Sequence, residues 1–326
     1  MPDRFDTEIL PADAHGIARA VGWIAAGQPV AMPTETVYGL AADARSGEAV
    51  ARIYAAKGRP AFNPLIVHVP DGRTAEALAR FDPPARRLAA RFWPGPLTLV
   101  LPLAPQAAIA GLATAGLPTI ALRVPAHPVM RAVLEQAGCP LAAPSANASG
   151  TISPSRAEHV ARTLGGRIPL ILDGGATAHG LESTIVAVEA DRLRLLRPGP
   201  IDAAQLAETA GVPLAGPAAA RIEAPGQLES HYAPSKPLRL NATHSRPGEW
   251  MIGFGPIPGD ATLSAAGDLV EAAARLFDLL HEADAAEAPG IAVAPIPAEG
   301  LGTAINDRLR RAAAPRAAAS GLPRSG

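Results

Sequence analysis

Short runs of apolar residues alternate along this chain with segments whose apolar residues recur at helical spacing, and this alternation constrains the fold more than any other feature. Runs such as "LTLVLPL" have the length of buried strands, while "GEAVARIYAAKG" has the spacing and terminal glycine of a helix. Strands that alternate with helices and then cluster indicate an α/β domain with a mixed sheet. The expected helices are residues 13–27, 47–58, 74–80, 84–92, 127–138 and 155–166. The expected strands are residues 29–32, 64–69, 97–103, 119–125, 170–175, 183–189 and 192–199, and residues 140–147 are expected to be a strand that runs into a loop.

The pattern changes after residue 210, where a stretch rich in Pro, Gly and Ala shows no sustained period. Such a composition is typical of a linker. Beyond it the order strand, strand, helix, strand and helix predicts a small Rossmann-like α/β domain. We therefore expect a large domain over residues 10–210, a linker over 211–237, a small C-terminal domain over 238–314 and a disordered tail over 315–326.

Composition and charge limit the classes of function that the chain can serve. Hydrophobic residues make up 48% of the 326 residues, and the net charge of −1 gives no overall attraction to nucleic acid or to an anionic membrane, although a local basic patch stays open. The single cysteine, Cys139, excludes an internal disulfide and indicates a reducing, cytoplasmic setting. Residues 1–10 lack the apolar core of a signal peptide, and no apolar run reaches the roughly 18 residues that span a bilayer, so we expect no membrane contact.

The stretch "KGRP" contains one of only two lysines among the 29 lysines and arginines of the chain, Lys57 and Lys236. Gly58 is expected to end a helix, and in an extended exit Lys57 and Arg59 would point to the same side. A compact ammonium beside a forked guanidinium suits a polyphosphate. The alternative is a pair of cations that stabilises the negative end of the helix dipole.

Two further stretches carry hydroxyl and amide groups. "APSANASG" places Ser145 and Asn147 on one side of an extended segment, where they suit phosphate oxygens or a nucleotide, although the same residues are common in ordinary turns. In "PTETVYGL", Thr34, Thr36 and Tyr38 share one strand face and would line either a pocket edge or an exposed surface.

Arg123 stands inside the otherwise apolar run "IALRVP", and a charge in such a strand needs a partner or an anionic ligand. His68 lies at a strand end, where a histidine is either structural or a ligand contact. Ser183 opens a strand and Arg197 ends one. These groups include no obvious nucleophile and no carboxylate pair, so they favour phosphoryl or nucleotidyl transfer in which a bound substrate attacks and Mg²⁺ assists the leaving group.

Seven motifs together resemble those of one known family: "PTETVYGLAADA", "KGRPAFNPLIVHV", "FWPGPLTLVL", "IALRVPAHP", "APSANASGTISPS", "ESTIVAV" and "LLRPGPI". With "SHYAP" and "EGLGTAINDRLRRAA" further on, the chain resembles the threonylcarbamoyl-AMP synthase family in its long form, from residue 10 to about residue 313. The resemblance implies a YrdC-like catalytic domain, in which a twisted mixed sheet and its helices surround a large concave cavity, and a small C-terminal domain. It also implies a nucleotidyltransferase that joins L-threonine, bicarbonate and ATP into threonylcarbamoyl-AMP and releases pyrophosphate. Separate transferase proteins would then modify adenosine 37 of tRNA to t6A.

The resemblance assigns residues of this sequence to roles. The residues implied for L-threonine are Thr36, His68, Arg123, Ala143 and Ser183, with Arg123 facing the carboxylate. The residues implied for ATP are Lys57, Arg59, Asn63, Thr119, Ser145, Asn147, Ser153, Arg197 and Tyr232. The residues implied for catalysis are Lys57, Arg59, Ser145 and Asn147. Mg²⁺ would be carried by the nucleotide without a metal site of the protein, and contact with tRNA would be weak.

Two alternatives stay open on the sequence alone. One is a carbamoyl transferase built on the same module, although the zinc-finger and acylphosphatase segments of such proteins are absent from the sequence. The other is an RNA-binding module that uses the face around "KGRP", although the net charge of −1 disfavours it. The linker also departs from the family pattern, because "APGQLESHYAP" carries Gln227 and Glu229 where a more basic stretch is expected, which would weaken its attraction for phosphates.

Overall fold

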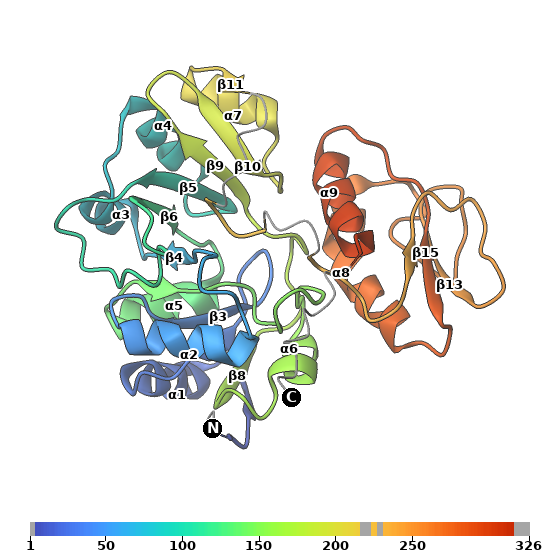
Figure 1. Cartoon of the computed structure of the whole chain (residues 1–326), viewed down its shortest axis with the longest axis horizontal. Coiled ribbons are helices and arrows are strands. Elements are labelled where there is room, and N and C mark those ends of the chain that lie inside the picture. Colours follow the sequence, from blue (N-terminus) through green and yellow to red (C-terminus); the bar gives the residue numbers. More distant parts are fainter. Residues whose placement is uncertain (1–3, 216–222, 227–230, 316–326) are drawn as a thin grey trace, which may run out of the picture.

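Figure 1 shows the computed structural model of the chain, in which residues 4–215, 223–226 and 231–315 are described. The mixed sheet that the sequence predicts for the large domain is confirmed, and a small α/β domain lies beside it. The strands of the large sheet follow the order β1 (Glu8–Pro11), β8 (Leu170–Asp173), β2 (Val30–Met32), β3 (Gly39–Asp43), β7 (Leu141–Ala142), β4 (Ile66–His68), β6 (Thr119–Arg123), β5 (Leu97–Pro102), β9 (Thr184–Val188), β10 (Leu193–Arg197) and β11 (Leu214–Ala215).

The small domain is a parallel sheet with two helices on the side that faces the large domain (Figure 1). Its strands follow the order β12 (Leu238–Arg239), β15 (Gly290–Val293), β13 (Glu249–Gly253) and β14 (Ala261–Thr262), and its helices are α8 (Leu269–Ala285) and α9 (Leu301–Ala313). The helices of the large domain are α1 (Ala14–Ala25), α2 (Gly47–Lys57), α3 (Gly72–Leu78), α4 (Pro83–Phe92), α5 (Pro128–Ala137), α6 (Ala157–Leu164) and α7 (Ala203–Ala210). Within the described residues, none of these helices has the length and apolar character needed to cross a membrane.

The order of the central strands brings together residues that are distant in the sequence. Strand β4 lies between β6 and β7, so that His68 stands opposite both Arg123 and Leu141. A single bridge joins Gly39, the first residue of β3, to Ser145 in the loop after β7. These pairings bring β3, β4, β6 and the loop after β7 to neighbouring positions in the large domain.

Helix α2, which precedes the "KGRP" stretch, has clear start and stop signals. The Ser46 side chain accepts a hydrogen bond from the Ala49 amide at the first turn. Gly58 adopts a left-handed φ of 60°, which strains any residue with a side chain. The helix therefore ends directly after Lys57, as predicted, and the chain turns before Arg59.

Four elements of the large domain were not predicted as separate elements, and one of them is β3, which lies within the stretch "PTETVYGLAAD". Among the described residues, strand β1 pairs only with β8 and is largely exposed, so it lacks an apolar run. Helix α7 is short, and β11 falls in the stretch expected as a linker, where it pairs with β10 and extends the sheet past residue 210. The linker positions Gln227 and Glu229 and residues 316–326 of the expected tail lie outside the described residues.

A stacked pair of histidines joins the two domains. The rings of His159 on α6 and His281 on α8 lie with their centroids 3.8 Å apart and their planes 18° apart. The charged groups that act on this pair are Asp278, whose carboxylate lies 3.8 Å from His159 Nδ1, Asp284, and the cations Arg156 and Arg162. Burial lowers the pKa of His159 to about 3 and that of His281 to about 4, so both rings are neutral at pH 7.

We expect the protein to lose stability as the pH falls below 6.5. In the unfolded chain each ring titrates near 6.5, whereas in the folded chain the rings titrate at about 3 and about 4. The unfolded state therefore binds more protons within this pH window. Each histidine can lower the free energy of unfolding by up to about 1.4 kcal/mol per pH unit. Melting temperatures measured from pH 8 to pH 5 should fall less steeply in His281→Phe, which keeps a stacking ring. Equal slopes in wild type and His281→Phe would contradict this, and His244→Phe, at an exposed site, is the control.

Candidate active site

A cavity of about 40 Å³ lies where β4, β6 and β10 end. This volume holds a few water molecules and is far below the roughly 300–1,000 Å³ of typical ligand pockets. The expected large cavity is therefore nearly closed in this conformation, and part of its wall comes from the linker. The residues that line it are Thr34, Thr36, Val37, Gly39, Arg59, Ile66, His68, Arg123, Ala143, Pro144, Ser145, Glu182, Arg197, Pro225, Gly226 and His231.

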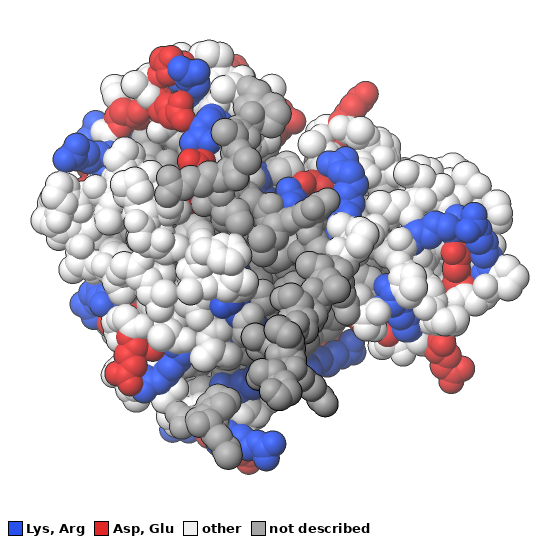
Figure 2. Space-filling model, in the orientation of Figure 1, with Lys and Arg blue, Asp and Glu red and all other residues white. Residues whose placement is uncertain are grey.

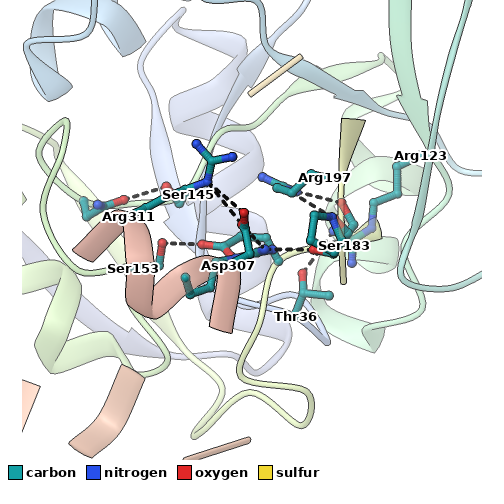
Figure 3. A network of polar contacts seen from close by, with 12 residues as sticks. Thr36, Arg123, Ser145, Ser153, Ser183, Arg197, Asp307 and Arg311 are labelled. Carbon is teal, nitrogen blue, oxygen red and sulfur yellow. Dashed lines mark hydrogen bonds and ion pairs between the residues drawn. The ribbon is translucent and has the colours of Figure 1, made fainter. Parts of the chain in front are cut away.

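Arg123 reaches the cavity from the end of β6 and forms a buried polar network (Figure 3). Its Nη2 donates to Glu35 Oε1 at 2.6 Å, its Nη1 donates to Thr36 Oγ1 at 3.0 Å, and its Nε donates to Gly95 O at 3.3 Å. Burial alone would raise the pKa of Glu35, but the charge and hydrogen bond of Arg123 outweigh it and lower that pKa to about 2. The two side chains therefore form an ionised pair at neutral pH.

His68 stands beside Arg123 and lines the cavity with its ring. Its Nδ1 atom is buried and has no hydrogen-bond partner among the described residues. Burial, followed by the charge of Arg123, lowers the pKa of His68 to about 3. The ring is therefore neutral at neutral pH and can exchange a hydrogen bond with a ligand without adding charge.

The two cations of "KGRP" point to different places. Arg59 lines the cavity, and its Nη2 donates to Pro64 O at 3.0 Å. Lys57 lies behind the wall, where its Nζ donates to Ser145 O and Asn147 O at 2.5 Å each. Burial and the charge of Arg59 hold the pKa of Lys57 well below its usual value. Lys57 thus determines the shape of the loop that presents Ser145.

The loop after β7 carries the predicted hydroxyl and amide pair. Ser145 Oγ donates to Asn147 Oδ1 at 2.6 Å, so the two side chains are in contact. The Asn147 amide in turn donates to Thr151 O at 2.8 Å. Ser145 therefore lines the cavity, while Asn147 stabilises the loop through its contacts with Ser145 and Thr151.

Arg197 supplies a third cation to the lining, at the end of β10. Its Nε donates to Ser183 O at 3.0 Å and its Nη2 donates to Ser183 Oγ at 3.1 Å, and this hydroxyl also lies 2.7 Å from Thr98 Oγ1. The linker packs closely here, since a Cβ added to Gly226 would lie 2.9 Å from Arg197 Cδ and from Tyr232 Oη. Substitution of Gly226 would therefore disturb both the cation and the ring.

The small domain also reaches this site, through Arg308 on α9. Arg308 is 0% exposed, and its Nε donates to Glu182 Oε2 at 2.8 Å. Its Nη1 donates to Pro198 O at 2.8 Å and to Asp307 Oδ2 at 3.0 Å. The other carboxylate oxygen of Glu182 accepts a hydrogen bond from Ser153 Oγ at 2.5 Å. Although burial alone would raise the pKa of Glu182, its cationic neighbours, Arg308 first, lower it.

Several buried polar atoms at or behind the cavity wall lack a hydrogen-bond partner among the described residues. Each such atom costs roughly 1–3 kcal/mol when it stays unpaired. Their concentration around one cavity indicates that a polar ligand completes the site. These atoms are Asn63 Oδ1, His68 Nδ1, His231 Nδ1, Tyr232 Oη and Arg308 Nη2.

The structure distributes the residues predicted from the sequence over three positions. On the lining lie Thr36, Arg59, His68, Arg123, Ala143, Ser145 and Arg197. In contact with lining residues, or with the loop that carries them, lie Lys57, Asn63, Asn147, Ser153, Ser183 and Tyr232. Thr119 stands at the opposite end of β6 from Arg123, and the structure does not bring it to the cavity.

Glu35 was not predicted as a site residue, because a strand pattern places its side chain on the face opposite those of Thr34 and Thr36. The chain instead turns there, with the Thr34 amide and hydroxyl both donating to Val37 O. This turn lets Glu35 and Thr36 both face Arg123.

Arg308 escaped prediction although its signal is present in the sequence. It falls on the apolar stripe of α9, between Ile305 and Ala312, where a charge needs a partner for the same reason as in β6. Glu182 and His231 carry no comparable signal, because both stand in irregular segments.

Within the described residues, no three His, Cys, Asp or Glu side chains converge in a way that could hold a metal ion. The lining carboxylate, Glu182, is already engaged by Arg308 and Ser153. The cations Arg59, Arg123 and Arg197 give the cavity the character of an anion site.

Comparison with known proteins relates both parts of the chain to one group of enzymes. Residues 23–199 match the Sua5/YciO/YrdC family model, described as telomere recombination, and residues 201–314 match the model described as the threonylcarbamoyl-AMP synthase C-terminal domain. The chain is 40% identical to the threonylcarbamoyl-AMP synthase of Bacillus subtilis, over 95% of this chain and 96% of that protein. It is also 40% identical to the threonylcarbamoyl-AMP synthase of Pyrococcus abyssi, over 90% of this chain and 92% of that protein. Its structure is similar to that of P. abyssi Sua5 complexed with L-threonine, with a TM-score of 0.85 and 37% identity over 94% of this chain and 98% of that one.

Proposed function

The chain belongs to the threonylcarbamoyl-AMP synthase family in its long form, and we propose that its cavity joins L-threonine, bicarbonate and ATP into threonylcarbamoyl-AMP with release of pyrophosphate. The observation that carries this proposal is the buried Arg123, which lines a cavity together with two further arginines and a neutral histidine. Such a site binds two anions side by side, a carboxylate and a polyphosphate.

The threonine end of the site is assigned to the strand ends around Arg123. The guanidinium would pair with the substrate carboxylate, while Thr36, His68 and the Ala143 backbone would contact its remaining polar groups. Ser183 would complete this pocket through its hydrogen bond with Arg197. The P. abyssi relative that was solved with L-threonine supports this choice of substrate.

The nucleotide end of the site is assigned to Arg59, Ser145 and Arg197 on the lining, with Lys57 and Asn147 holding the loop that presents Ser145. The remaining residues assigned to ATP are Asn63, Ser153, Tyr232 and, by resemblance alone, Thr119. Mg²⁺ would arrive on the phosphates and offset the charge of the leaving pyrophosphate.

The reaction that fits these groups needs no nucleophile from the protein. The threonine amine and bicarbonate form a carbamate and water. A carbamate oxygen then attacks the α-phosphorus of ATP, and the bond to the bridging oxygen breaks to release pyrophosphate. Arg59 and Arg197 would stabilise the charge that develops on the phosphates, and Arg123 would hold the amine of threonine toward the attack.

We propose that the cavity, which is about 40 Å³ here, opens to admit ATP during the reaction cycle. Pro225, Gly226 and His231 of the linker form the wall that would move. We propose that the linker and the small domain close over ATP and keep water from the labile adenylate. We also propose that the cycle takes place in the cytoplasm and that separate transferase proteins pass the threonylcarbamoyl group to tRNA, giving t6A.

The first test of this function is pyrophosphate release from ATP and Mg²⁺, measured with and without bicarbonate and L-threonine and with L-serine as control. We expect release to require bicarbonate and threonine together. Release that ignores threonine, or that appears only with carbamoyl phosphate, would instead favour a carbamoyl transferase.

The RNA-binding alternative predicts a different result. Figure 2 shows acidic and basic side chains interspersed over the part of this face where the described residues are in view, without a continuous basic surface there. Binding of tRNA that is tight and strongly dependent on salt, in the absence of pyrophosphate release, would support that alternative over catalysis.

A further inference from the structure

The small domain places one charged side chain deep in the wall of the active site. Arg308 on α9 is 0% exposed and bridges two carboxylates, Glu182 of the large domain and Asp307 of its own helix. Asp307 has a second cation, since Arg311 Nε donates to it at 3.1 Å (Figure 3). Among the described residues, Arg308 is the partner with which Glu182 forms an ion pair.

The position of Glu182 makes its charge important for the site. Glu182 lines the same cavity as Arg197 and Arg59, the cations assigned to the phosphates. A carboxylate without an ion-pair partner there would repel a polyphosphate or would form an ion pair with Arg197. In a buried site both effects lower the affinity for ATP. The pair with Arg308 removes both effects.

Arg308 also packs on the ring that the linker contributes. Its guanidinium carbon lies 5.4 Å from the centroid of the Tyr232 ring, within reach of a cation–π contact. The Tyr232 hydroxyl, which has no hydrogen-bond partner among the described residues, lies close to Arg197 and Gly226. One side chain of the small domain therefore contacts two elements of the nucleotide end.

We propose that Arg308 is a positioning residue of the nucleotide site: it neutralises Glu182 from the second domain and thereby leaves Arg197 available for the ATP phosphates. This inference rests on the proposed function and adds to it a specific electrostatic role for the small domain. Detachment of α9 from the large domain would expose Glu182 and lower the affinity for ATP, so the site is complete only when both domains are in contact.

The test is a double-mutant cycle on Glu182 and Arg308. In Arg308→Met we expect KM for ATP to rise roughly 10- to 100-fold, because an unpaired carboxylate then faces the phosphates. KM for threonine should rise less than KM for ATP, because Arg308 bonds to Glu182, whereas the threonine carboxylate is assigned to Arg123, which bonds to Glu35. In the double variant Glu182→Gln, Arg308→Met the carboxylate is gone, and KM for ATP should return to within about threefold of the wild type.

A purely structural role for Arg308 predicts another pattern. The methionine would then impair the protein equally with and without Glu182, and the double variant would not recover. Arg308→Lys keeps the positive charge and should keep KM for ATP near that of the wild type. This variant therefore tests the proposal even if Arg308→Met does not fold. A large rise in KM for ATP in Arg308→Lys would overturn the proposal.

Two controls separate this inference from the proposed function. Arg275→Met removes an exposed arginine that pairs with Glu271 on α8 at 3.3 Å, and it should leave both KM values unchanged. If the wild type makes no threonylcarbamoyl-AMP, the proposed function is wrong. If the wild type is active and the double variant shows no recovery, only the role of Arg308 is wrong.

Discussion

Arg123→Met is expected to lower kcat/KM for L-threonine by roughly 30- to 5,000-fold, because truncation of one partner of a buried, hydrogen-bonded charge pair with a ligand costs about 2–5 kcal/mol. Arg123 is the cation assigned to the substrate carboxylate, and its removal also leaves Glu35 buried without its counter-charge. The melting temperature should therefore fall as well. Kinetics of pyrophosphate release at varied threonine concentration measure the first effect, and thermal unfolding measures the second.

A second variant separates these two effects. Glu35→Gln, Arg123→Met removes the orphaned charge and should recover much of the melting temperature, while threonine-dependent activity stays lost. Arg19→Met is the matched control, since Arg19 pairs with Glu8 at 2.8 Å on the exposed surface and such pairs contribute little. Near-normal threonine kinetics in Arg123→Met would remove Arg123 from the substrate site.

Lys57→Arg is expected to reduce turnover roughly 10- to 100-fold, because extra volume in a fully packed niche costs about 1–3 kcal/mol. The ammonium of Lys57 contacts the carbonyl oxygens of Ser145 and Asn147 at 2.5 Å each, and a planar guanidinium cannot take that position without moving their loop. The affinity for ATP should change only a few-fold, since the lining cations remain. Turnover from pyrophosphate release and ATP affinity from calorimetry test this prediction.

The second lysine of the chain provides the control for this substitution. Lys236 also donates to backbone carbonyls, among them Ala283 O at 2.9 Å, but it lies at the end of α8 outside the cavity. Lys236→Arg should leave turnover and ATP affinity unchanged. An equal loss of turnover and ATP affinity in Lys57→Arg would mean that Lys57 holds the nucleotide directly.

The strong elements of the fold could be predicted because each carries its own local signal. Helix α2 has a serine cap and a terminal glycine, and β5 and β6 are apolar runs of strand length. Strand β1 and the short β11 carry no such signal, because their pairing partners and not their own residues determine them. The order of the strands, which brings His68 beside Arg123, also depends on long-range pairing that no local pattern encodes.

The site could be predicted where a residue type conflicts with its surroundings. Arg123 in an apolar strand is such a conflict, and the same reasoning applied to α9 would have found Arg308. The directions of the Lys57 and Arg59 side chains could not be predicted. The left-handed turn at Gly58 places Lys57 behind the cavity wall and Arg59 on the cavity lining. Alternation along the chain holds only where the backbone stays extended.

The most direct test of this account is the mass of the nucleotide that the protein makes from ATP, L-threonine and ¹³C-labelled bicarbonate. We expect an AMP adduct that contains one threonine and one labelled carbon, and we expect Arg123→Met to make far less of this adduct than the wild type. A threonyl-AMP without the label, or an adenylate that lacks threonine, would show that the cavity performs a different reaction.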